Sequence, residues 1–189
     1  MRITRNIRKI GLTMAAAAAV VSVGTVATPA HAETFYNIKV QHSGKVLTAE
    51  RVSGTVLAGA RVIQTTPNPF NRDAQWFIRP QPGEHIETYE LRDDILTPDG
   101  HRVRGCISLT HIVLNNTPLI VLPCNGSNRL KWKYTHVGDD YYEINTVRGN
   151  GEWYWHIQNA STVENAPLVE FSGPGGSNAR FYWDPVGDG

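Results

Sequence analysis

Residues Cys106–Trp132 have the sequence CISLTHIVLNNTPLIVLPCNGSNRLKW, and this stretch decides the fold. It contains both cysteines of the 189-residue chain and ends on an aromatic anchor that has a counterpart in each flanking third of the sequence. The counterparts are Trp76, 56 residues before Trp132, and Phe181, 49 residues after it. We therefore interpret the chain as three versions of one unit, covering approximately residues 35–83, 84–138 and 139–186.

Each unit contains short segments of β-strand composition in the same order. They begin at Tyr36, Lys45, Gly59 and Ala74 in the first unit, at Tyr89, Gly105, Thr117 and Leu130 in the second, and at Tyr142, Trp153, Ala166 and Ala179 in the third. One unit cannot bury its apolar face alone, whereas three units that close on one another form a barrel without open strand edges. The pattern predicts an all-β barrel with Trp76, Trp132 and Phe181 pointing inward, each burying about 150–250 Å². An irregular sandwich is the alternative.

The first 32 residues are expected to lie outside this fold. A basic start is followed by the apolar run Ile10–Val26 and by the small-residue cleavage pattern Ala30-His31-Ala32. These features predict a secretory signal peptide of bacterial type over residues 1–32, and a secreted, extracellular single domain over residues 33–189. No later stretch approaches 18 apolar residues, so we expect no membrane span.

Charge and cysteine content limit the possible partners and the compartment. The leader carries four of the 18 Lys and Arg and none of the 17 acids, so the remaining chain has a net charge of 14 − 17 = −3. A mildly acidic domain without a basic cluster is not expected to bind nucleic acid. Two cysteines in an exported chain are expected to pair, and a Cys106–Cys124 disulfide would contribute about 3 kcal/mol in the chain-entropy model. Two buried thiols are the alternative.

The segment from Cys124 to Trp132, CNGSNRLKW, resembles the C-N-G-x-x-N-Q-x-W segment of ricin-B-type lectin repeats. Arg129 and Leu130 stand where that family has Asn and Gln, and Gly105-Cys106-Ile107-Ser108 stands at its K-C-L-D segment. The resemblance covers nearly the whole chain after the leader. It implies a β-trefoil, in which three pseudo-repeats close a barrel with a hairpin cap, and a disulfide between the two cysteine positions.

The sugar-binding motif of that family is eroded here. No repeat keeps the glutamine, and the family's aspartate is replaced by Thr48, Ser108 and His156. The resemblance places the three ligand positions of each repeat at Thr48, Gln64 and Asp73, at Ser108, Leu122 and Arg129, and at His156, Phe171 and Asn178. Only the third set combines an aromatic platform with an amide, and Trp155 lies beside it in sequence. We therefore predict a ligand site formed by His156, Phe171, Asn178 and Trp155, with core and turn roles as the alternative.

Three functions follow from this pattern. The first is a secreted carbohydrate-binding module for a glycan or polysaccharide, and the second is a non-enzymatic adaptor for another secreted protein. The third is a trefoil-type protease inhibitor that offers Arg72 from the loop Thr65–Asp73, whose prolines reduce the entropy lost on docking. No nucleophile elbow or zinc motif occurs, so we expect neither catalytic residues nor a metal or cofactor.

Overall fold

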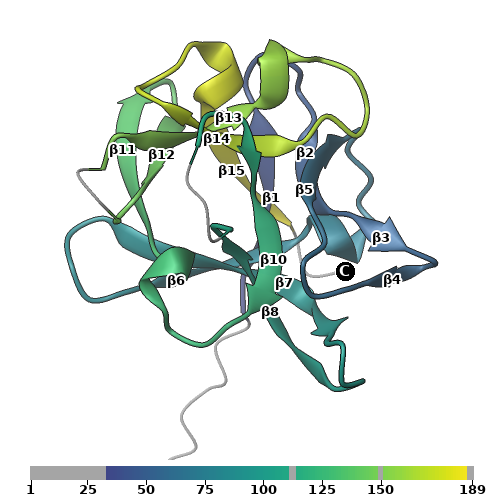
Figure 1. Cartoon of the computed structure of the whole chain (residues 1–189). Helices are drawn as coiled ribbons and strands as arrows, with labels where there is room; N and C mark the ends of the chain where they lie inside the picture. The colour runs from purple at the N-terminus through teal and green to yellow at the C-terminus, as the bar shows by residue number, and fades with distance from the viewer. Residues whose placement is uncertain (1–32, 111–113, 149–150, 187–189) are drawn as a thin grey trace, which may run out of the picture. The chain divides into compact units, whose positions relative to one another are not determined.

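The computed structural model describes residues 33–110, 114–148 and 151–186, which form an all-β domain (Figure 1). The predicted signal peptide lies outside the described residues. None of the helical segments described is long and apolar enough to cross a membrane.

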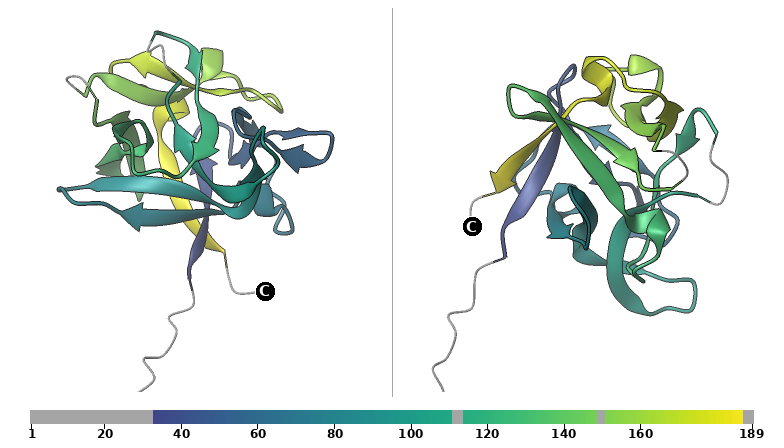
Figure 2. Two further views of the ribbon diagram at one scale, coloured as in Figure 1. Left: turned by 60° about the horizontal axis from the view of Figure 1, so that its bottom comes forward. Right: turned by 90° about the vertical axis from the view of Figure 1, so that its left-hand side faces the viewer.

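Six strands form a closed barrel, two from each third of the sequence. They are β1 (Phe35–Val40), β6 (Trp76–Pro80), β7 (Ile86–Leu96), β11 (Trp132–Gly138), β12 (Tyr141–Thr146) and β15 (Phe181–Val186). Each strand pairs antiparallel with the next in this order, and β15 pairs with β1 to complete the ring. Figure 2 shows β1 and β15 side by side, which brings the two ends of the described domain together. Closure leaves the barrel without an open edge.

Three hairpins cover one end of the barrel, one from each third of the sequence. They pair β2 (Val46–Ala49) with β5 (Val62–Thr65), β8 (Arg102–Ser108) with β10 (Ile120–Pro123), and β13 (Trp153–Ile157) with β14 (Leu168–Ser172). They meet at Val62, Leu119 and Leu168, which are fully buried. The Val62 amide donates to the Leu119 carbonyl, and the Leu119 amide to the Leu168 carbonyl, both at 2.9 Å. This barrel and cap confirm the predicted β-trefoil.

The remaining elements are short. The strands β3 (Arg51–Val52) and β4 (Thr55–Val56) form a separate hairpin, and β9 (Thr117–Pro118) pairs with β14. The 3-10 helices are η1 (Arg72–Ala74), η2 (Asn128–Leu130), η3 (Gln158–Ala160) and η4 (Ser177–Ala179). Three of them, η1, η2 and η4, each end two residues before an aromatic anchor.

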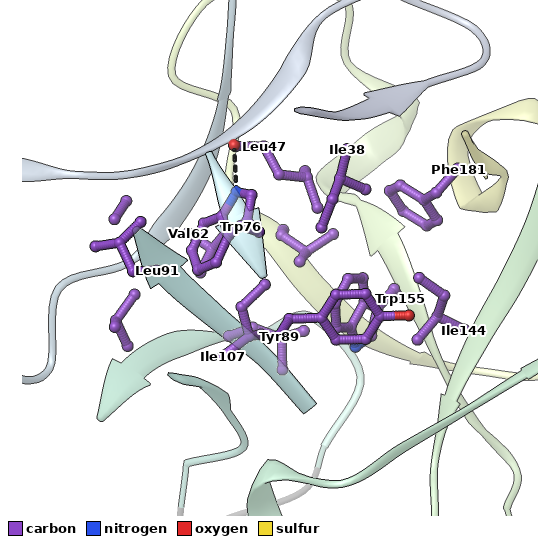
Figure 3. Close-up of a cluster of buried hydrophobic side chains, with 14 of the residues drawn as sticks. Ile38, Leu47, Val62, Trp76, Tyr89, Leu91, Ile107, Ile144, Trp155 and Phe181 are labelled. Carbon is purple, nitrogen blue, oxygen red and sulfur yellow. Dashed lines mark hydrogen bonds between the residues drawn. The ribbon is translucent and has the colours of Figure 1, made fainter. Parts of the chain in front are cut away.

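The three predicted anchors lie in the core. Trp76, Trp132 and Phe181 have no exposed surface. The Trp76 indole donates to the Leu47 carbonyl at 2.9 Å, as Figure 3 shows, and the Trp132 indole donates to the Ile107 carbonyl at 3.1 Å. These bonds tie β6 and β11 to the cap hairpins of their own repeats, and they satisfy indole groups that are costly to bury without a partner.

The eroded glutamine positions also belong to the core. Ala74, Leu130 and Ala179 stand there and are at most 2% exposed. Apolar side chains at this position bury surface without needing a hydrogen-bond partner.

The predicted disulfide is present in the second repeat. Cys106 lies on β8, and Cys124 follows the last residue of β10. Their Cα atoms are 5.2 Å apart, which is within the range that a disulfide spans. The bond therefore joins the two strands of the second cap hairpin.

Candidate functional site

A hollow of about 320 Å³ lies on the outer face of the β13–β14 hairpin. The hairpin itself is in the upper part of Figure 1. Alternate side chains of a strand point to the same face, so His156 on β13 shares this face with its cross-strand partner Val169 and with Phe171 on β14. The turn η4 brings Asn178 to the same place, and Asn116 approaches from the segment before β9.

His156, Phe171 and Asn178, predicted from sequence, line this one hollow. The ring centroids of His156 and Phe171 are 5.3 Å apart, and the Asn178 Nδ2 lies 3.3 Å from the His156 Nδ1. Phe171 is 38% exposed, whereas His156 is only 8% exposed. The aromatic ring is thus available to a ligand, and the imidazole lies behind it.

The hydrogen bonds of His156 fix its tautomer. The Nε2 lies 3.2 Å from the Gly173 carbonyl oxygen, which can only accept, so Nε2 carries the hydrogen. The Nδ1 is then the acceptor for the Asn178 amide. Burial lowers the pKa of His156 below its ordinary value, and the bond to the Gly173 carbonyl offsets part of this effect. The imidazole is therefore neutral at pH 7.

Backbone close to the ring completes the wall of the hollow. A Cβ added at Gly175 would lie 2.4 Å from the His156 Cε1 and 2.5 Å from the Ala179 Cβ, so no larger residue fits beside the ring. Opposite, Asn159 and Ala160 have φ values of 53° and 48°, the left-handed region that costs an alanine about 1–2 kcal/mol.

The hollow is uncharged. Of the described residues that line it, none is Asp, Glu, Lys or Arg. Its polar groups are the amides of Asn116, Asn159 and Asn178, the Ser172 hydroxyl and backbone, and its apolar wall includes Ile157 and Val169. An amide both donates and accepts, which matches neighbouring hydroxyl groups of a sugar ring. The exposed Phe171 ring offers an apolar face for its C–H side.

Trp155, predicted as a fourth ligand residue, is instead a core residue. It is fully buried and pairs with Glu170, on the opposite face of the hairpin from His156. Figure 3 places it beside Tyr89, whose ring centroid is 4.9 Å away. The alternation of side chains along β13 was the signal for this, because residues 155 and 156 must point to opposite faces. The aromatic residue paired with Phe171 is Tyr154.

The first repeat places a different set of residues at the equivalent position. Thr48 pairs with Ile63, so the structural counterpart of Phe171 is Thr65, not Gln64 as the sequence suggested. A shift of one residue reverses the face, and Gln64 is fully buried. Its amide group donates to the carbonyls of Ser161 and Val163 at 2.8 and 2.9 Å. Gln64 therefore joins the first and third repeats.

A second hollow, of about 410 Å³, lies beside Thr48 and Thr65, and its lining includes two of the first-repeat ligand positions that the resemblance implied, Thr48 and Asp73. Its wall includes Asp73, which is 3% exposed and accepts a hydrogen bond from the Arg51 guanidinium. Phe70 stands at its rim and is 89% exposed. Phe70 lies in a turn just before the 3-10 helix η1, and this turn explains its exposure. The turn is closed by a hydrogen bond from the Asn71 backbone amide to the Asn68 carbonyl at 3.0 Å.

The structure argues against Arg72 as an inhibitory residue. Arg72 lies in η1, and its guanidinium forms a 2.7 Å ion pair with Asp93. The side chain would lose this partner on entering a protease pocket, at a cost of about 0–1 kcal/mol for an exposed ion pair. The side chain that projects from this loop is Phe70.

The second repeat offers the least to a ligand. Ser108 is fully buried, and its hydroxyl donates to the Leu109 carbonyl at 3.0 Å. Leu122 stands at the aromatic position, and residues 111–113 lie outside the described residues.

Among the described residues, the one cluster with metal-ligand spacing is Glu90 with Cys106 and Cys124, and the disulfide occupies both sulfur atoms.

Comparison with known proteins supports the same fold. No protein-family model matches the sequence, and no curated protein matches it. Among solved structures, the designed three-fold symmetric protein ThreeFoil is 24% identical, with a TM-score of 0.65 over 79% of this chain and 97% of that one. A ricin B-like lectin from Macrolepiota procera, solved with lactose, is 12% identical, with a TM-score of 0.61 over 83% of this chain and 99% of that one.

The match also extends to part of a larger enzyme. An exo-β-1,3-galactanase from Clostridium thermocellum is 24% identical, with a TM-score of 0.65, and the match covers 82% of this chain but 31% of that one. At these identities the likeness establishes the fold. The chain thus has the β-trefoil fold that the resemblance to ricin-B-type lectins implied.

Proposed function

We propose that the chain is a secreted, non-catalytic carbohydrate-binding protein whose ligand site is the hollow of the third repeat. The observation that carries this proposal is the meeting of the half-exposed Phe171 ring with the Asn178 amide in an uncharged hollow. Export rests on the predicted signal peptide and is consistent with the disulfide. The lactose complex of the Macrolepiota lectin supports a sugar as the ligand class.

A glycan array combined with polysaccharide pull-down tests this function. The wild-type chain is expected to retain at least one uncharged glycan, and Phe171→Ala is expected to weaken that binding about tenfold or more through loss of the stacking surface. The matched control is Phe70→Ala, which removes an exposed phenylalanine from the first repeat and should leave binding unchanged. Loss of binding in Phe70→Ala, with Phe171→Ala unaffected, would place the ligand in the first repeat instead.

An adaptor function is the second candidate, and the exposure of Phe70 favours it. A phenylalanine that is 89% exposed on an ordered turn is the kind of side chain that anchors a protein interface. A blank result on a broad glycan array, together with co-purification of another exported protein that Phe70→Ala abolishes, would support this function over carbohydrate binding.

A further inference from the structure

We propose that His156 is a positioning residue that sets which atoms of the Asn178 amide face the ligand, and that its neutral form makes the hollow selective for an uncharged saccharide. The inference rests on the proposed carbohydrate function. It gives a role to the histidine that distinguishes the third repeat, because the counterparts of His156 in the first and second repeats are Thr48 and Ser108.

The ring is held so that it can act only through Asn178. The Gly173 carbonyl accepts the Nε2 hydrogen, Gly175 leaves no space beside Cε1, and the Phe171 ring centroid lies 5.3 Å from that of the imidazole, which is only 8% exposed. The one side-chain group bonded to Nδ1 is the Asn178 amide nitrogen. Because both ring nitrogens are engaged, we assign His156 a role through Asn178 in place of the direct ligand contact that the family resemblance implied.

The bond to Nδ1 determines the orientation of the amide. While Nδ1 is an acceptor, the Asn178 NH2 group points to the ring, and Oδ1 remains for the ligand together with the second Nδ2 hydrogen. The hollow then presents both an acceptor and a donor, as vicinal sugar hydroxyls require. No described residue donates a hydrogen bond to that Oδ1.

Protonation of His156 reverses this arrangement. A hydrogen on Nδ1 opposes the Asn178 NH2 group, so the amide turns over and Oδ1 accepts from the ring. The ligand then meets the NH2 group and loses its acceptor. Among the described residues no other charged group faces the ring, because β14 faces it with Val169 and Phe171, the following loop with glycines, and η4 with Asn178 and Ala179.

The same lining excludes charged ligands. Of the described residues around the hollow, none supplies a cation for a carboxylate or sulfate, or a carboxylate for an amine. A charged group that enters such a site loses its hydration without gaining an opposite charge. Neutral hexoses and N-acetylated hexosamines remain as the class that fits.

Nuclear magnetic resonance of the ligand-free chain tests the positioning role. In long-range ¹⁵N spectra of the histidines between pH 8 and pH 4.5, His156 is expected as the Nε2–H tautomer, with the exposed His101 as the reference in the same spectrum. The Asn178 side-chain amide is expected to shift with the midpoint of His156. The inference is overturned if His156 is the Nδ1–H tautomer, or if the chemical shift of the Asn178 side-chain amide does not change as His156 titrates. In Asn178→Asp, the adjacent carboxylate is expected to raise the midpoint of His156 by about one pH unit or more.

Binding of lactose and of N-acetylgalactosamine, followed by chemical-shift titration, tests the consequence. Affinity is expected to fall about tenfold between pH 7.5 and one unit below the His156 midpoint, the effect of one lost hydrogen bond. His156→Gln keeps an acceptor without a titrating group, so its affinity should not change with pH. Equal wild-type affinity at both pH values, or stronger binding of sialic acid than of either sugar, overturns the inference. If no sugar binds at pH 7.5, the carbohydrate function fails, and the spectra of the free chain still decide the role of His156.

Discussion

Replacement of Glu170 by glutamine is expected to stabilise the protein at alkaline pH. Glu170 lies on β14 with no exposed surface, and neither carboxylate oxygen has a hydrogen-bond partner among the described residues. Gln64 occupies the equivalent position in the first repeat, where its amide is fully bonded. The fold therefore already accepts a glutamine at this point of the cap hairpin.

The magnitude follows from the pKa of Glu170. Burial raises this pKa from 4.5 to about 7, and the charge of Arg148 only partly opposes the effect. The folded state thus keeps a proton that the unfolded state loses above pH 4.5, so stability falls as the pH rises from 4.5 to about 7. The difference of 7 − 4.5 = 2.5 units corresponds to about 3 kcal/mol, which is lost in full above pH 8. Glutamine is neutral throughout and avoids this loss.

Urea unfolding from pH 5 to pH 9, with the disulfide intact, measures the effect. The free energy of unfolding of Glu170→Gln should exceed that of the wild type by less than about 1 kcal/mol at pH 5 and by about 3 kcal/mol at pH 8.5. Glu87 has a pKa raised to about 7 by burial, but it is present in both proteins and cancels in the difference. Glu152→Gln, at an exposed glutamate, should change stability by less than about 0.5 kcal/mol. A Glu170→Gln effect that is absent at pH 8.5, or the same at all pH values, would refute the reasoning.

Two further predictions concern stability. The double variant Cys106→Ser, Cys124→Ser should lose about 3 kcal/mol in urea unfolding, because its unfolded state is no longer restricted, and addition of a reductant to the wild type should reproduce the loss. Trp132→Phe should lose about 2–4 kcal/mol, because it removes both the indole bond to the Ile107 carbonyl and buried volume. An effect of Trp132→Phe below about 1 kcal/mol would show that the core closes around the smaller ring.

The sequence predicts the fold well because the fold depends on features that recur. Three aromatic anchors with similar spacing, each after short β-type segments, require three equivalent units, and the disulfide follows from the compartment and from the family resemblance. The same reasoning selects His156, Phe171 and Asn178, since each repeat offers a position to compare, and the structure places these three in one hollow. These predictions concern positions that the threefold pattern fixes directly.

The errors concern register and loops, which the pattern does not fix. Gln64 was placed one residue from the true counterpart of Phe171, and a one-residue shift exchanges a buried face for an exposed one. Trp155 was assigned by its proximity in sequence to His156, although neighbours on a strand point apart. Phe70 was missed, because its exposure depends on a turn within the loop, and the ion pair of Arg72 with Asp93 joins residues that lie far apart in sequence.

The third repeat differs from the other two inside the core as well as at the surface. Leu47 and Ile107 each accept an indole hydrogen from their anchor, but their counterpart Trp155 faces Phe181, which has no such hydrogen. The larger side chain at position 155 compensates for the smaller one at position 181, so the core stays filled with one fewer hydrogen bond. The Trp155 indole nitrogen is itself buried with no hydrogen-bond partner among the described residues, so the exchange leaves one donor unpaired in the core. Trp155 and His156 are neighbours on β13, so the strand that carries this exchange also carries the candidate site on its opposite face.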